Sequence, residues 1–61
     1  MAQEFRAFAY IYLGSGQEDP ARDRVTIDVG GMRATMVGVP DEASAVDVAI
    51  QLAEEGAQAI D

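Results

Sequence analysis

The chain has 61 residues and a net charge of −7, from 11 acidic residues and four basic ones, all arginine. This charge excludes the basic surfaces with which proteins bind nucleic acids and anionic membranes. The sequence has no His, Cys, Lys or Trp, which excludes the commonest general base, the Cys and Lys nucleophiles and the ordinary zinc ligands.

The first predicted element is a strand over residues 5–13, a short run rich in aromatic residues. Side chains alternate along a strand. Neither of the two sets of side chains is polar in this strand. We therefore expect other parts of the protein to cover both faces of it, as for a central strand. The two sets are Phe5, Ala7, Ala9, Ile11 and Leu13 on one face and Arg6, Phe8, Tyr10 and Tyr12 on the other.

Residues 14–23 form a predicted loop, with one helical turn that Pro20 begins behind an Asp19 cap. Because of its two glycines, the segment Gly14-Ser15-Gly16 has a phosphate-binding loop as one interpretation. A phosphate loop needs Gly-Lys-Ser or Gly-Lys-Thr before a helix, whereas acidic residues follow here. A plain flexible loop is the favoured interpretation.

A β-hairpin is predicted over residues 24–39, because Gly30-Gly31 suits a two-residue turn in which both residues have positive φ. This turn places apolar residues opposite one another on one side of the hairpin. It also places Asp28 opposite Arg33, which we interpret as a solvated cross-strand pair rather than a catalytic pair. The apolar pairs are Val29 with Met32, Ile27 with Ala34 and Val25 with Met36, and Thr26 faces Thr35 on the polar side.

Asp41 after Pro40 is a predicted N-cap, and the helix is expected to run from Asp41 or Glu42 to Glu55 and to end at Gly56. The 100° periodicity predicts that Val46, Ile50 and Ala53 are buried against the sheet. The same periodicity predicts that Asp47, Gln51 and Glu54 are exposed. The five residues 57–61 are a predicted short last strand.

These elements predict an α/β fold: a small mixed sheet of first strand, hairpin and short last strand, with one helix on one face. The chain is expected to be a single small domain over residues 1–61, or the N-terminal fragment of a longer one. The sequence resembles the N-terminal part of a family of small, uncharacterised bacterial α/β proteins, whose members continue into a Cys-Gly-Gly-Phe-Gly segment. The resemblance lies in residues 19–24, 38–40 and 52–60. The resemblance implies the fold of the chain but no known catalytic or binding activity.

The predicted function is a non-catalytic scaffold or self-assembly module in the cytoplasm, with no cofactor and no metal. One helix covers only one face of a sheet, and the apolar side of the hairpin is its expected partner. The face with Phe8, Tyr10 and Tyr12 is then expected to meet another copy or a missing C-terminal segment, unless the loop over residues 14–23 covers it.

A second hypothesis is a small-ligand-binding protein or an enzyme, with its site at the carboxyl ends of the strands near Gly38 and Asp41 and beyond Asp61. A hard-cation site built from Asp19, Asp23 or Asp41 is a weaker alternative, because the spacing matches no calcium-binding loop.

Overall fold

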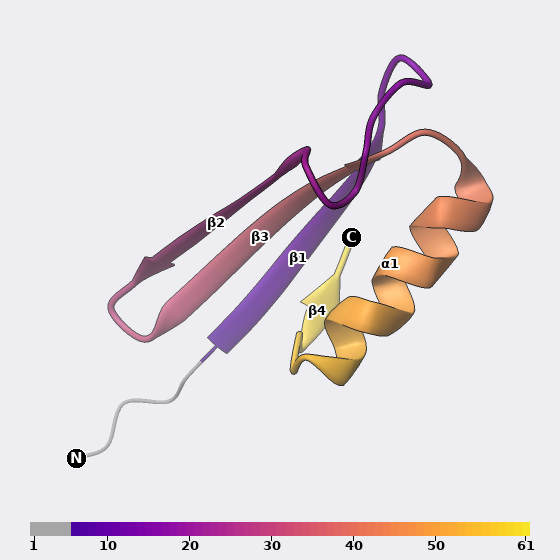
Figure 1. Ribbon diagram of the computed structural model, residues 1–61. Coiled ribbons are helices and arrows are strands. Elements are labelled where there is room, and N and C mark those ends of the chain that lie inside the picture. The colour runs from indigo at the N-terminus through magenta and orange to yellow at the C-terminus, as the bar shows by residue number, and fades with distance from the viewer. Residues whose placement is uncertain (1–5) are drawn as a thin grey trace.

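The computed structural model describes residues 6–61, which form one four-stranded sheet and a helix on one of its faces (Figure 1). The predicted α/β architecture is confirmed, and Phe5 lies outside the described residues. The strands lie in the order β2-β3-β1-β4. The elements in chain order are β1 (Arg6–Leu13), β2 (Arg24–Val29), β3 (Met32–Val39), α1 (Glu42–Glu54) and β4 (Ala59–Ile60).

The hairpin of β2 and β3 has the predicted bounds, turn and register. Gly30 and Gly31 have φ values of 61° and 80°, which are accessible to glycine at little cost. Every predicted cross-strand pair is present, including Val29 with Met32 and Val25 with Met36. The turn residues therefore determine which side chains share a face along the whole hairpin.

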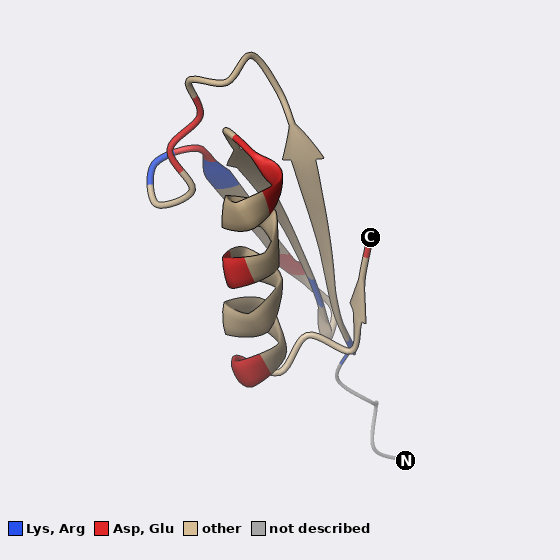
Figure 2. Cartoon of the chain, turned by 90° about the vertical axis from the view of Figure 1, so that its right-hand side faces the viewer, with Lys and Arg blue, Asp and Glu red and all other residues tan. Residues whose placement is uncertain are grey.

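Strand β1 lies at the centre of the described sheet, parallel to β3 on one side and to β4 on the other. The short β4 is extended by hydrogen bonds of Asp61, whose N–H donates to the Ala9 carbonyl (2.9 Å) and whose carbonyl accepts from the Ile11 N–H (2.8 Å). In Figure 2 the three parallel strands β3, β1 and β4 point upwards behind α1, and β4 lies to the right of β3. The β3–α1–β4 connection is therefore the usual right-handed crossover.

Helix α1 begins behind Asp41, as predicted. The Asp41 carboxylate accepts a hydrogen bond from the Ser44 N–H (2.7 Å), which satisfies one of the donors that a helix start leaves without a partner. The helix ends before Gly56, whose φ of 105° turns the chain towards β4.

The predicted rotation of α1 about its axis is wrong. Val48 and Leu52 face the sheet and are 5% and 4% exposed, whereas Val46 and Ile50 are 59% and 55% exposed. Ala53 is also exposed, as are Asp47, Gln51 and Glu54, the last three as predicted. Val48 lies about 160° round the helix from Val46. Periodicity could not choose between these two faces, because both are apolar.

The predicted sheet face for α1 is also wrong. The helix covers Ala7 and Ala9 of β1 together with Val37 and Val39 of β3, and the apolar side of the hairpin is on the opposite face. Small alanine side chains let a helix approach a strand closely, whereas Phe8, Tyr10 and Tyr12 would hold it away. Within residues 6–61, α1 contacts β1, β3 and β4 but not β2. The first strand therefore decides which face the helix covers.

Candidate interaction surface

The sheet face opposite α1, called the outer face below, is an uncovered apolar surface. It combines the aromatic side of β1 with the apolar side of the hairpin, and Val29 is 68% exposed, Tyr10 50% and Tyr12 44%. Parallel pairing aligns Phe8 with Ala34 and Tyr10 with Met36. The outer face consists of Phe8, Tyr10, Tyr12, Val25, Ile27, Val29, Met32, Ala34 and Met36. None of these nine residues is charged, and the charged residues Arg6, aligned with Met32, and Asp61, beside Tyr10, lie at the margins of the same face.

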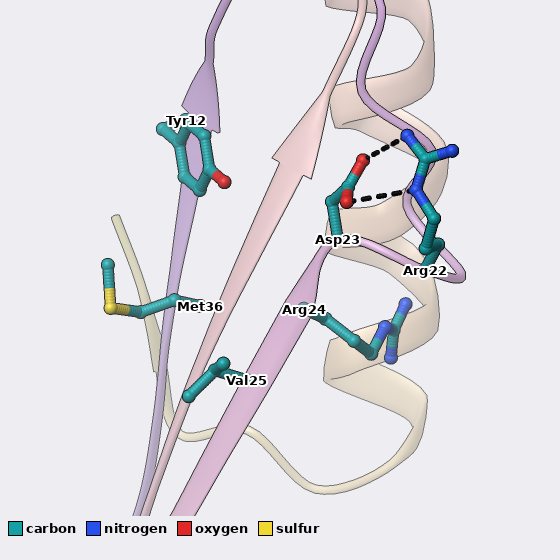
Figure 3. Close-up of a pocket in the computed structure, with 6 residues that line it drawn as sticks. All are labelled: Tyr12, Arg22, Asp23, Arg24, Val25 and Met36. Atoms are coloured by element: carbon teal, nitrogen blue, oxygen red, sulfur yellow. Dashed lines mark hydrogen bonds and ion pairs between the residues drawn. The ribbon is translucent and has the colours of Figure 1, made fainter.

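A hollow of about 400 Å³ lies at the end of the outer face where β1 and β3 finish. Tyr12, Met36 and Val25 line it from the three strands, as Figure 3 shows. Arg22, Asp23 and Arg24 form its border at the loop and the start of β2. The hollow is open to solvent and mainly apolar, so an apolar side chain from outside the chain could enter it.

The side chain of Tyr12 lies over Gly38, the residue that pairs with Tyr12 on β3. A Cβ atom on Gly38 would lie 2.7 Å from the Tyr12 hydroxyl and 3.0 Å from Cγ of Glu18. The missing side chain thus makes room for the ring, which lies flat on the neighbouring strand. Gly38 is buried as a result, and its N–H donates to the Asp23 carbonyl (2.8 Å). Because Gly38 has no side chain, the Tyr12 ring can lie over it, and this gives the outer face its shape at this end.

The loop between β1 and β2 uses its carboxylates on its own backbone. Glu18 accepts from the Ser15 N–H (2.9 Å) and the Gly16 N–H (3.0 Å), and these bonds, with Ser15 the largest cause, lower the pKa of Glu18. The anion that a phosphate cradle would hold is here replaced by the chain's own carboxylate. The predicted turn at Pro20 is present, since the Asp23 N–H donates to the Asp19 carbonyl (2.6 Å).

Arg22 and Asp23 form the closest ion pair of the hollow, at 2.7 Å between Nη2 and Oδ2. The hydrogen bond from Arg22, and next the one from the Asp19 N–H, lower the pKa of Asp23 to about 2. The same pair raises the pKa of Arg22. Both side chains are partly exposed, so the pair orders the loop rather than burying charge.

Asp41 does not join the other predicted site residues. Its carboxylate caps α1, and the hydrogen bond from Ser44 lowers its pKa. A negative charge therefore already occupies the helix N-terminus, where an anionic ligand would bind. Within residues 6–61, no group of three or more acidic side chains is placed to hold a metal ion.

Four of the five residues predicted for a ligand end or an interface lie together: Phe8, Tyr10 and Tyr12 on the outer face and Gly38 beneath Tyr12. The sequence prediction missed the hairpin's contribution, because it assigned the hairpin's apolar side to the helix. The signal was present in the alternation of β2 and of the first half of β3. The alternation identifies an apolar face but does not say which partner covers it.

The family model of DUF6506, a family of unknown function, matches residues 6–61. The chain belongs to DUF6506. No curated protein and no solved structure matches it. Membership of DUF6506 confirms the resemblance to an uncharacterised family, while its bacterial origin and its Cys-Gly-Gly-Phe-Gly segment stay predictions. In the described part of the chain, no helix is both long enough and apolar enough to cross a membrane.

Proposed function

We propose that the chain is a non-catalytic assembly module that associates with a second copy of itself through the outer face. The observation that carries this proposal is the uninterrupted apolar surface of three strands on the side away from α1. With strands about 4.8 Å apart and a rise of about 3.3 Å per residue, this face covers roughly 350 Å² in projection. The largest apolar patch of a typical monomer is about 300–600 Å² and is often an interaction site.

Charge supports a second copy as the partner at this face. The chain carries a net charge of −7, so two copies repel one another, and the repulsion is smallest where they meet with their carboxylates far apart. The polar side of α1 carries Glu42, Asp47 and Glu54 and no basic residue, as Figure 2 shows. The nine residues of the outer face include no carboxylate, and Asp61 lies at the β4 margin beside Tyr10. Identical acidic chains therefore bring fewer like charges together here than at α1.

Chain topology also favours a partner from outside the chain. The crossover through α1 is right-handed and moves across the sheet from β3 to β4. A further right-handed helix crossover in the same direction would place its helix beside α1, not on the outer face. The area of the outer face is small compared with the roughly 800 Å² per partner of standard interfaces. We therefore expect a weak, concentration-dependent dimer.

Sedimentation velocity over a wide concentration range tests this proposal. The wild-type mass is expected to rise from monomer towards dimer, and Val29→Lys is expected to keep the chain monomeric. Val46→Lys is the matched control, because Val46 on α1 is similarly exposed (59% against 68%) and the charge change is the same. A wild type that stays monomeric at the highest concentration, with circular dichroism showing it folded, would overturn the proposal.

The alternative of a ligand site at the carboxyl ends of the strands receives less support. Tyr12 lies over Gly38, and the Asp41 carboxylate already caps the helix that begins there. A ligand bound at this edge would have to displace both. These contacts are typical of a structural junction between β3 and α1.

A further inference from the structure

The two ends of the outer face differ in shape. At the hairpin end, Val29 and Met32 form the last apolar pair, with 68% and 49% of their surface exposed. At the other end, Val25 and Met36 form the first pair, are 56% and 47% exposed, and line the hollow of about 400 Å³ beside Tyr12. One end therefore has a hollow, and the other ends in two exposed apolar side chains.

We infer that two copies pack their outer faces about a two-fold axis that runs across the strands, so that the hairpin end of each copy fills the hollow of the other. This inference rests on the proposed self-association and specifies its geometry. The axis follows the middle row of the face, formed by Ile27, Ala34 and Phe8, which are aligned by the two strand pairings. Each strand then lies opposite the same strand of the second copy, and the two run in opposite directions.

The spacing of the pairs makes this fit possible. The pair of Val29 and Met32 lies two residues to one side of the middle row, and the pair of Val25 and Met36 lies two residues to the other side. A two-fold rotation about the middle row therefore places the Val29–Met32 pair of one copy opposite the Val25–Met36 pair of the other copy. The two sheets would lie about 10 Å apart, with the side chains of both faces in the space between them.

A two-fold axis parallel to the strands gives a poorer fit. It would set the exposed Met32 against the partner's Met32 and the hollow at Met36 against the partner's hollow, which leaves the hollow unfilled. Packed interiors tolerate few voids larger than a water molecule. It would also bring Arg6, at the border of the face, against Val29, whereas the crosswise axis brings Arg6 over the ring of Tyr10, a favourable contact for a cation.

Cysteine crosslinking in this naturally cysteine-free chain distinguishes the two axes. We would make Ala34→Cys, Met32→Cys and Met36→Cys in the full chain, confirm folding by circular dichroism, and treat each with a short bis-maleimide. Mixtures would combine one unlabelled variant with one ¹⁵N-labelled variant, so that mass spectrometry separates mixed from like dimers. Ala34→Cys lies on both axes and serves as the positive control.

The crosswise axis predicts crosslinked dimers of Ala34→Cys, and several-fold more of the mixed Met32–Met36 product than of either like product. Like products of Met32→Cys and Met36→Cys in excess over the mixed one would overturn this geometry and leave self-association standing. If folded Ala34→Cys does not crosslink and sedimentation shows a monomer, the proposed function itself fails.

Discussion

The packing of α1 on the sheet can be tested with one substitution made at two neighbouring positions, Val48→Ala and Val46→Ala. Val48 is 5% exposed and lies in the core with Leu52, Ala9 and Val37, whereas Val46 is 59% exposed. The structure predicts that Val48→Ala destabilises the chain and that Val46→Ala does not. The orientation expected from sequence periodicity predicts the reverse.

The magnitude follows from burial. Val→Ala removes two carbon atoms, worth about 1.6 kcal/mol at about 0.8 kcal/mol per buried methylene, and the remaining cavity adds to this cost. Both substitutions replace a β-branched residue in the same helix, so the gain in helix propensity of a few tenths of a kcal/mol is common to both. We expect Val48→Ala to lower the free energy of unfolding by about 2 kcal/mol more than Val46→Ala.

Thermal and urea unfolding, followed by circular dichroism at low concentration, measure this difference. For a domain of this size about 1 kcal/mol shifts Tm by roughly 4–8 °C, so Val48→Ala should melt about 8–16 °C below Val46→Ala. Equal melting temperatures would mean that α1 does not pack through one face. A lower Tm for Val46→Ala would refute the structural orientation and restore the periodic one.

Further predictions concern the turn, the loop, the glycine under Tyr12 and catalysis. Gly31→Val should cost about 1 kcal/mol or more in thermal unfolding, because a β-branched residue resists the positive φ of this turn. Asp23 should titrate by NMR near pH 2, and Arg22→Gln should raise its pKa. Because the folded pKa is below the unfolded value, the stability from this pair is present above about pH 4 and is lost as the pH falls towards 2. Gly38→Ala should shift the NMR signals of the Tyr12 ring with little change in Tm, since the flexible end of Tyr12 can move away from the new Cβ. Residues 1–61 should show no enzymatic activity; turnover that is lost when one carboxylate is replaced would contradict this.

The hairpin could be predicted from sequence because its determinants are local. Gly30-Gly31 sets the turn, the turn sets the register, and the register pairs Asp28 with Arg33 at 3.2 Å. The cap at Asp41 was predictable for the same reason, since a carboxylate three residues before a free N–H needs no tertiary contact. Each of these predictions concerns residues close together in the chain.

The assignment of faces could not be predicted, because it depends on contacts between distant residues. The first strand offers an alanine side and an aromatic side, and α1 offers one apolar side around Val48 and another around Val46. Periodicity counts all four as apolar. The choice follows from size: the small side chain of Ala9 packs in the core with Val48 and Leu52, and the large aromatic side chains are on the other face.

These choices leave two apolar surfaces exposed, and their surroundings are different. Val46 and Ile50 lie on a helix whose charged side chains are all acidic, whereas the nine residues of the outer face include no carboxylate and only Asp61 lies at its margin. Two identical copies would bring like charges together if they met at α1, and they avoid this at the sheet. Salt should strengthen association at either surface, because it screens the repulsion between two chains of net charge −7. Substitution therefore locates the contact, and an association that Val46→Lys weakens more than Val29→Lys would place it on the helix instead.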